Sequence, residues 1–151
     1  MTYYPTIIFG AECRLKYKCY IFAGVYSISI NAEQLHQIQT IASSYENFQC
    51  VECSQAIQAY LISENIPGKL IKLYTGASTG ANSFIYDETF PEAAISTNGR
   101  HQGVAIIING IETVFDNHHP AGISRNEWMA NLLFQGLVHF GQQFEITEIE
   151  F

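Results

Sequence analysis

The segment Cys50-Val-Glu-Cys53-Ser-Gln-Ala-Ile57 places two cysteines where a helix is expected to begin. Farther along, Asn98-Gly-Arg-His101-Gln-Gly-Val-Ala-Ile106 places a histidine where an apolar strand begins, and Val114-Phe115-Asp116 ends the next strand on a carboxylate. A cysteine at a helix start, a histidine on a strand and an aspartate on the adjacent strand can form a thiol-based acyl-transfer site. This order of residues and elements predicts cysteine-dependent chemistry.

The hairpin at residues 101–116 is the clearest structural signal in the chain. Two apolar runs, 101–108 and 111–116, flank the dipeptide Asn109-Gly110. Both turn residues tolerate the positive φ that a type I′ turn requires. The sequence therefore predicts two adjacent antiparallel strands with a two-residue connection.

The register of this hairpin brings the histidine near the aspartate. Counting outward from the turn, Ile108 faces Ile111, and His101 falls opposite residue 118. Asp116 is then two positions diagonal to the partner of His101, which is within reach across neighbouring strands. We expect the imidazole and the carboxylate to meet.

The other elements complete an α+β fold in which N-terminal helices carrying the cysteine pack on an antiparallel sheet carrying the histidine and aspartate. Asn31 with Gln34 resembles a capping box, and Pro67 ends the second helix. Ser124 begins a third helix as another capping box. The expected helices cover residues 32–45, 51–64 and about 124–134, and the expected strands 69–74, 101–108, 111–116 and 144–151.

Length and composition limit the classes of protein. With 151 residues, we expect one domain over 1–151, comprising a β-rich extension at 1–30 and a core at 32–135. The net charge of −7 and the lack of any basic run predict no nucleic-acid partner. The most apolar stretch, 19–30, is shorter than the roughly 20 residues of a membrane span, so no membrane association is expected. No secretory signal is recognised, and the four cysteines are interpreted as reduced thiols.

Cys53 is the predicted nucleophile. A helix N-terminus presents free N–H groups and a positive dipole end, which favour a thiolate, and the Cys53 N–H could bind an oxyanion. His101 would take the thiol proton and return it to the leaving group. Asp116 would orient the imidazole, with Asn117 as the alternative orienter. Such a site needs no cofactor and no metal.

Three neighbouring residues leave alternatives open. Gln49 is the first candidate for a side-chain oxyanion donor, and Asn47 is the second. Cys50 is interpreted as a buried residue at the helix entry that could form a disulfide with Cys53 under oxidation. The same Cys-x-x-Cys pair, with a histidine, could instead belong to a small zinc-binding domain.

Four segments and one tryptophan form a recognisable set. They are Phe48-Gln-Cys-Val-Glu-Cys53-Ser-Gln-Ala-Ile57, Ile66-Pro-Gly-Lys-Leu-Ile-Lys-Leu-Tyr-Thr75, Asn98-Gly-Arg-His101-Gln-Gly-Val104, Val114-Phe-Asp116-Asn-His-His-Pro-Ala-Gly-Ile-Ser124 and Trp128. Together they resemble the papain fold toxin domains of bacterial polymorphic toxin systems. The resemblance covers roughly residues 32 to 135, and the Glu-Cys-Ser helix start is also similar to that of bacterial cell-wall cysteine endopeptidases.

The resemblance implies a papain-like fold and a papain-like cysteine hydrolase that acts on a protein or peptide amide as a toxin effector. Peptidases, deamidases and acyltransferases all occur in such groups, so the reaction stays open among the three. An immunity protein is the partner it implies. The expected place of action is the cytoplasm, or a target cell reached through a delivery system that this chain does not encode. A non-catalytic papain-like binding module is the competing interpretation.

Overall fold

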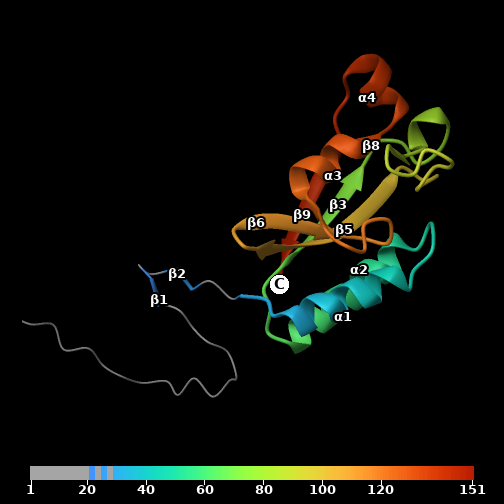
Figure 1. Ribbon diagram of the computed structural model, residues 1–151. Helices are drawn as coiled ribbons and strands as arrows, with labels where there is room; N and C mark the ends of the chain where they lie inside the picture. Colours follow the sequence, from blue (N-terminus) through green and yellow to red (C-terminus); the bar gives the residue numbers. More distant parts are fainter. Residues whose placement is uncertain (1–20, 23–24, 27–28) are drawn as a thin grey trace, which may run out of the picture.

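The computed structural model describes residues 21–22, 25–26 and 29–151 of the chain. Its central element is an antiparallel sheet (Figure 1). In spatial order the five strands are β7 (Ile123–Ser124), β6 (Ile111–Phe115), β5 (Arg100–Ile108), β3 (Lys69–Tyr74) and β9 (Glu145–Glu150). The last strand of the chain therefore lies at one edge of the sheet, next to β3.

The expected β-rich extension is only partly described. Two short strands, β1 (Ile21–Phe22) and β2 (Val25–Tyr26), pair with each other in antiparallel fashion. The apolar run Thr6-Ile7-Ile8-Phe9 of this extension predicts a short strand, and this run and the cysteines Cys13 and Cys19 lie outside the described residues.

Two helices, α1 (Ala32–Ser43) and α2 (Cys50–Ser63), cover one face of the sheet (Figure 1). The predicted capping box opens α1: the Asn31 side chain accepts from the Gln34 N–H at 2.8 Å, and the Gln34 side chain accepts from the Asn31 N–H at 3.2 Å. Both helices place apolar residues at helical spacing against the sheet, and these form one buried cluster with Leu70, Val104, Ile106 and Phe115.

The opposite face carries the second buried cluster. Side chains alternate between the two faces of a strand, so Leu70 and Val104 face α2, whereas their neighbours Ile71 and Ala105 face the other side. There they pack with Trp128 from α3 (Arg125–Asn131). The molecule thus has a helix layer, a sheet and a second, smaller helix layer (Figure 1).

The predicted hairpin is confirmed in its turn and in its register. Asn109 and Gly110 have φ values of 51° and 80°, as a type I′ turn requires. Ile108 pairs with Ile111 as expected. The ladder between β5 and β6 ends at the pair formed by Val104 and Phe115. Beyond that pair the two strands are free to diverge.

The third helix is shorter than predicted. Ser124 caps it by accepting the N–H of Glu127, but α3 ends at Asn131 because the next two residues pair as β8 (Leu132–Leu133) with β4 (Tyr86–Asp87). A short 3₁₀ turn, η1 (Ala81–Ser83), and a separate helix, α4 (Gln135–Phe140), complete this end of the molecule. Among the described residues, no helix has the length and apolar character needed to cross a membrane.

Candidate active site

His101 and Asp116 meet where the hairpin ladder ends. The Nε2 atom of His101 lies 2.9 Å from Oδ2 of Asp116, and both side chains are removed from solvent. His101 is the second residue of β5, and Asp116 follows directly after β6. The diagonal contact expected from the hairpin register is therefore present in the structure.

Asp116 is bound by several donors at once. Its Oδ2 also accepts the indole N–H of Trp128 at 2.7 Å. Its Oδ1 accepts the backbone N–H groups of His118 at 2.8 Å and His119 at 2.7 Å, and the Nδ1 of His119 lies 3.2 Å away. Burial alone would raise the pKa of Asp116, but the hydrogen bonds from His101 and His119 hold it well below its usual value. The carboxylate stays charged and fixed in place.

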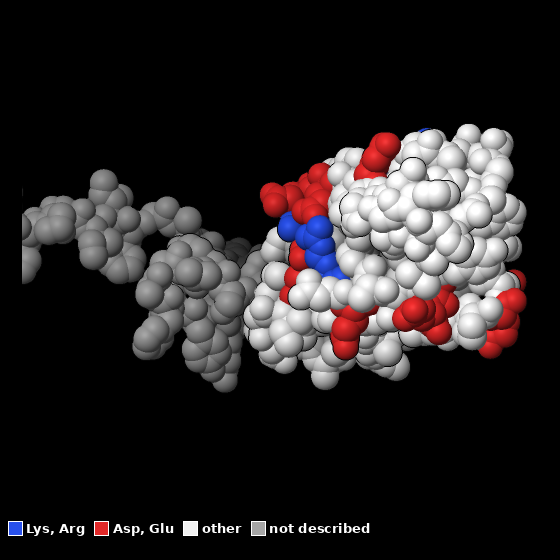
Figure 2. Space-filling model, turned by 90° about the horizontal axis from the view of Figure 1, so that it is seen from above, with Lys and Arg blue, Asp and Glu red and all other residues white. Residues whose placement is uncertain are grey.

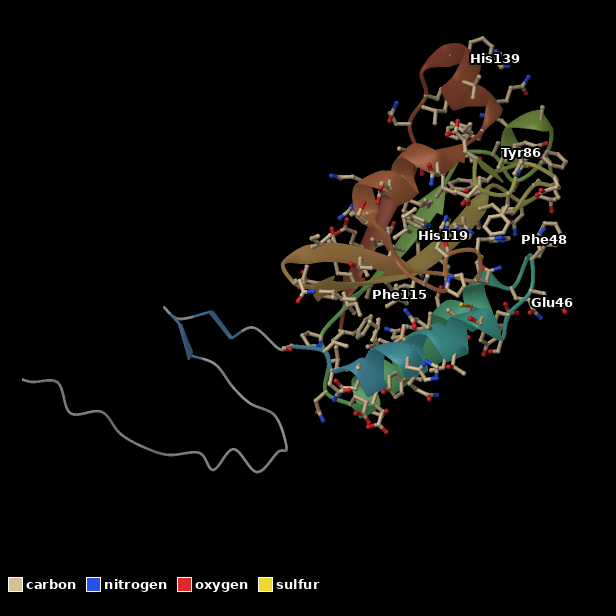
Figure 3. The ribbon with its side chains drawn as sticks, in the orientation of Figure 1. Glu46, Phe48, Tyr86, Phe115, His119 and His139 are labelled. Carbon is tan, nitrogen blue, oxygen red and sulfur yellow. The ribbon has the colours of Figure 1, made fainter. Side chains whose placement is uncertain are left out.

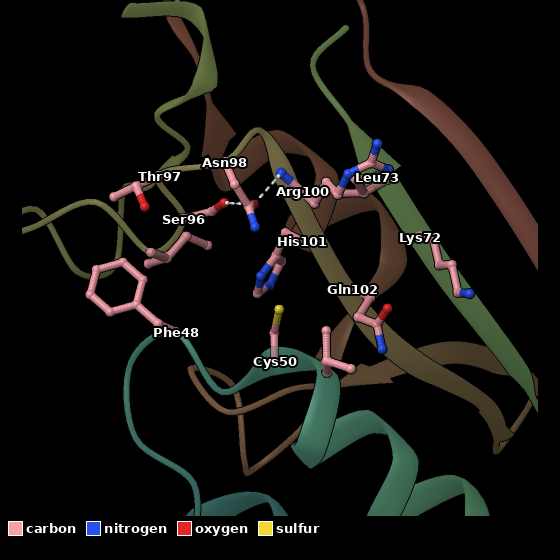
Figure 4. A pocket seen from close by; sticks show the side chains of 12 residues that line it. Phe48, Cys50, Lys72, Leu73, Ser96, Thr97, Asn98, Arg100, His101 and Gln102 are labelled. Atoms are coloured by element: carbon pink, nitrogen blue, oxygen red, sulfur yellow. Dashed lines mark hydrogen bonds between the residues drawn. The ribbon is translucent and has the colours of Figure 1, made fainter. Parts of the chain in front are cut away.

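Cys50, the first residue of α2, lies opposite the other ring nitrogen of His101. In Figure 4 the sulfur of Cys50 points toward the imidazole of His101. Within the described part of the chain, Nδ1 of His101 is buried and has no partner in good hydrogen-bond geometry. Burial would lower the pKa of His101, but the contacts with Asp116 and Cys50 raise it to about 10. This favours a protonated imidazole beside the sulfur of Cys50.

Cys53 does not lie in the position expected of a nucleophile. Its side chain has no exposed surface and belongs to the core cluster formed with Ile57 and Leu61. Burial first, and then the nearby charges of Asp116 and Cys50, raise the pKa of Cys53 to about 12. A thiol in this environment is a small core side chain. The sulfur that lies beside His101 in the structure is that of Cys50, three residues before Cys53.

The loop that precedes α2 holds Cys50 in place. Figure 3 shows Glu46 and Phe48 in this loop between α1 and α2. Phe48 has a φ of 68°, and the N–H of Gln49 donates to the carbonyl of Glu46 at 3.2 Å, so the chain turns sharply before the helix begins. The first helical bond runs from the Cys53 N–H to the Gln49 carbonyl, and no side chain caps this helix. The Cys50 N–H thus stands in the first turn, where helix N–H groups have no intrahelical partner.

Gln49 was predicted as an oxyanion donor, and the structure gives its side chain another contact. The Oε1 atom of Gln49 accepts the N–H of Glu46 at 2.7 Å, and the residue is exposed and not among those lining the pocket over Cys50. The amide side chains that do line this pocket are those of Asn98 and Gln102 (Figure 4).

Asn47 and Asn117 connect the loop before α2 to the segments around the histidines. Asn47 donates to the carbonyl of Ala94 at 3.0 Å, and its Oδ1 lies 3.1 Å from Nε2 of His118. Asn117, the alternative orienter, donates instead to the carbonyl of Glu46 at 2.7 Å. These bonds link segments far apart in the sequence and fix the loop against the end of the hairpin.

A second histidine extends the buried network. The Nε2 atom of His119 lies 3.3 Å from Oδ2 of Asp87 and 3.3 Å from Oγ1 of Thr89. Burial would lower the pKa of His119, but its hydrogen bond to Asp116 and the nearby charges of Asp116 and Asp87 raise it. The imidazole of His119 therefore lies between two buried carboxylates, which favour its protonated form. The sequence alone gave no reason to choose His119 over His118.

A pocket of about 340 Å³ opens over Cys50 and His101 (Figure 4). It gives the thiol and the imidazole space for a substrate segment rather than a closed core. The other residues lining it are Phe48, Val51, Lys72, Leu73, Ile95, Ser96, Thr97, Asn98, Arg100 and Gln102.

The zinc alternative needs at least three suitable side chains close together. Among the described residues, no group of three or more His, Cys, Asp or Glu side chains is arranged to hold a metal ion. Cys50 and Cys53 are both free thiols. The described residues therefore contain no set of ligands for the zinc site considered as an alternative.

The fold and the site define an α+β protein of papain-like architecture, with cysteine at a helix start and histidine and aspartate on an antiparallel sheet. Residues 33–133, about two thirds of the chain, match the family described as Papain fold toxin 2. The chain belongs to this family, as the sequence segments had indicated. Comparison with curated proteins and with solved structures gave no significant match.

Proposed function

We propose that this protein is a papain-like cysteine hydrolase that acts on a protein or peptide amide as a bacterial toxin effector. In this proposal Cys50 is the nucleophile, His101 the general acid and base, and Asp116 the residue that orients His101. The arrangement of the Cys50 sulfur, Nδ1 of His101 and the carboxylate on Nε2 is the observation that carries it. Family membership supports the same conclusion.

The first half of the reaction forms a thioester. The thiolate of Cys50 attacks the amide carbon, and a C–S bond forms while the carbonyl π electrons move to the oxygen. The Cys50 N–H at the start of α2, together with the side-chain amide of Gln102, is the candidate set of oxyanion donors. Protonated His101 then gives its Nδ1 proton to the leaving nitrogen, the C–N bond breaks, and an amine or ammonia departs.

The second half regenerates the enzyme. A water molecule gives a proton to neutral His101 as its oxygen attacks the thioester carbon, and collapse of the intermediate expels the thiolate. The products are a carboxylic acid and the original Cys50–His101 pair. A backbone amide substrate makes this a peptidase reaction, a glutamine side chain makes it a deamidation, and an amine in place of water makes it acyl transfer.

The test is the pH dependence of Cys50 alkylation by iodoacetamide, followed by peptide mass spectrometry, in wild type and His101→Ala. We expect Cys50 of the wild type to react at pH 6 at least about tenfold faster than in the variant, whose thiol should follow an ordinary cysteine with a pKa near 8.5. Cys53 in the same digest is the internal control and should stay unmodified in folded protein. His101→Gln provides a second variant if loss of the imidazole volume impairs folding.

The enzymatic part of the proposal would be contradicted by one outcome, and the toxin role by normal growth of bacteria that express the wild type. Equal alkylation rates in wild type and variant across the pH range would mean that His101 does not activate Cys50, which leaves a papain-like binding module. The toxin role has its own measurement. Expression of the wild type inside bacteria should arrest growth, and Cys50→Ala should abolish this effect at equal protein level.

A further inference from the structure

Basic side chains are scarce in this acidic protein, and half of the Lys and Arg residues within the described ranges form ion pairs. The whole chain has seven Lys and Arg against 14 Asp and Glu, and four of the seven lie in the described residues. Lys69 and Arg125 share the carboxylates of Glu112 and Glu148 in a surface network. Figure 2 shows one face on which a strip of basic side chains lies beside acidic ones.

The two remaining cations of the described ranges, Lys72 and Arg100, form no ion pair there and both line the pocket over Cys50. They belong to neighbouring strands: Lys72 is opposite Gln102, and Arg100 is opposite Tyr74. Residues two apart on a strand, and residues directly opposite across a ladder, point to the same face. Lys72 and Arg100 are therefore diagonal neighbours on one face of the sheet.

The pocket has two chemically different ends. Among its described lining residues none is acidic, and Phe48 and Ile95 supply apolar surface. Figure 4 shows Phe48 on one side of the Cys50–His101 pair, and Lys72 and Arg100 on the other. An end with two exposed cations and no neutralising carboxylate in the lining attracts an anionic group.

Arg100 is also held in a defined position. Its guanidinium carbon lies 4.2 Å from the centroid of the Tyr74 ring. Stacking of this kind leaves the N–H edge of the guanidinium available for a carboxylate, which it can bind through two parallel hydrogen bonds. Glu145 stands opposite Tyr74 in the pairing of β3 with β9, yet it forms no ion pair with either cation in the described part of the chain.

We propose that Lys72 and Arg100 form a cationic subsite that binds an acidic side chain of the peptide substrate close to the reacting amide. This inference rests on the proposed function, since it names the substrate class of the same pocket: an acidic peptide segment. Arg100 binds the carboxylate in a fixed orientation, and Lys72 adds a mobile positive charge beside it.

The experiment uses short peptides that carry a central chloroacetylated diaminopropionate, flanked on either side by Glu or by the isosteric Gln. The rate of Cys50 modification is followed by mass spectrometry at about pH 9, where even an unactivated thiol with a pKa of about 8.5 reacts. The ratio of the Glu rate to the Gln rate thus measures the subsite whether or not His101 activates Cys50. The pH profile of alkylation tests that activation separately.

We expect the Glu peptides to react about three- to tenfold faster in wild type, the range that two exposed charge pairs provide. In a Lys72→Gln, Arg100→Gln double variant the ratio should approach one, and about 0.5 M salt should reduce it in the wild type. Lys69→Gln is the matched control, because it removes a cation outside the pocket and should leave the ratio unchanged. A wild-type ratio of one or less, or a ratio that the double variant preserves, would overturn the subsite.

Discussion

Nε2 of His101 lies 2.9 Å from Oδ2 of Asp116, and neither side chain has exposed surface. The two residues are joined by a short hairpin, so the contact depends on local structure more than on the global fold. The ladder ends one residue before Asp116, which frees its carboxylate to turn toward the histidine. A buried carboxylate on one ring nitrogen fixes the direction of the other, and that other nitrogen faces Cys50.

The first prediction separates the two cysteines. Cys50→Ala should abolish turnover and toxicity and leave the free energy of unfolding within about 0.5 kcal/mol of wild type, since its side chain lies at the edge of a pocket. Cys53→Ala should retain activity and lose about 1 kcal/mol of stability, because it leaves a small cavity in the core. Activity assays and urea unfolding of the two variants check this.

The reverse pattern would support Cys53 as the nucleophile, as the sequence predicted. An inactive, fully stable Cys53→Ala protein together with an active Cys50→Ala protein would mean that the helix presents the other thiol to His101. Cys53→Val serves as a control that fills the space of the sulfur with apolar atoms.

A second prediction concerns Asp116 and the indole that donates to it. Asp116→Asn should lower kcat by at least about 100-fold, because the amide cannot hold His101 in the same tautomer. It should also reduce stability by about 3 kcal/mol, since an amide nitrogen cannot accept the bonds now made to both carboxylate oxygens. Steady-state kinetics and chemical unfolding measure the two effects.

Trp128→Phe offers the matched comparison, because it keeps most of the ring volume and removes one donor to Asp116. We expect a smaller loss of stability, about 1–2 kcal/mol, and a modest decrease in kcat. If Trp128→Phe proved as harmful to kcat as Asp116→Asn, orientation of His101 would depend on the indole rather than on the carboxylate.

Much of the fold could be predicted from local sequence patterns. Asn109 and Gly110 determine the hairpin turn, and Asn31 with Gln34 determines the start of α1, because each relies on contacts within a few residues. The end of α3 could not be predicted in this way. Leu132–Leu133 pair with Tyr86–Asp87, and a pairing between distant segments overrides the helical pattern.

Local sequence patterns also do not decide which of Cys50 and Cys53, one helical turn apart, faces His101. The sequence predicted a helix from residue 51, whereas α2 begins at Cys50 itself. Positions three apart on a helix are rotated by only about 60° from each other. Cys53, Ile57 and Leu61 recur at a spacing of four residues and share the core face, whereas Cys50 lies at the edge of that face, where it lines the pocket. That apolar spacing was visible in the sequence, and it favoured Cys53 as a core residue over Cys53 as a nucleophile.

A third prediction concerns stability as a function of pH. The pKa of His101 is about 10 in the folded protein, above the value near 6.5 of an unfolded histidine, and the pKa of His119 is also raised. Their contribution to stability is complete below about pH 6.5 and is lost as the pH rises through the folded values. The free energy of unfolding should therefore decrease from about pH 6.5 toward pH 10.

His118 and Asp116, which lie close to His101, change the free energy of unfolding with pH in the opposite direction. Burial lowers the pKa of His118, so its contribution is present above about pH 6.5 and is lost on acidification. Asp116, with its lowered pKa, loses its contribution only below about pH 4. Urea unfolding at several pH values, in wild type and His119→Gln, measures the balance. The alkaline decrease should be shallower in the variant, and an identical slope would exclude a protonated His119.

The last prediction concerns the glycine that leads into the histidine strand. Gly99 has a φ of 73°, and a Cβ there would collide with the carbonyl oxygen of Ala77 and lie 2.6 Å from Oγ1 of Thr75. Gly99→Ala should cost about 3 kcal/mol or more and displace His101, which follows two residues later, so that kcat falls as well.

Gly110→Ala is the control for backbone strain alone. Gly110 has a similar φ of 80°, but no atom lies within 4 Å of the position its Cβ would take. We expect this variant to lose only about 1–2 kcal/mol and to keep its kcat. Chemical unfolding and kinetics of both variants separate the collision from the strain. Equal losses in the two proteins would mean that the turn before His101 can move aside, and that the close contact of Gly99 with residues 75–77 does not position the imidazole.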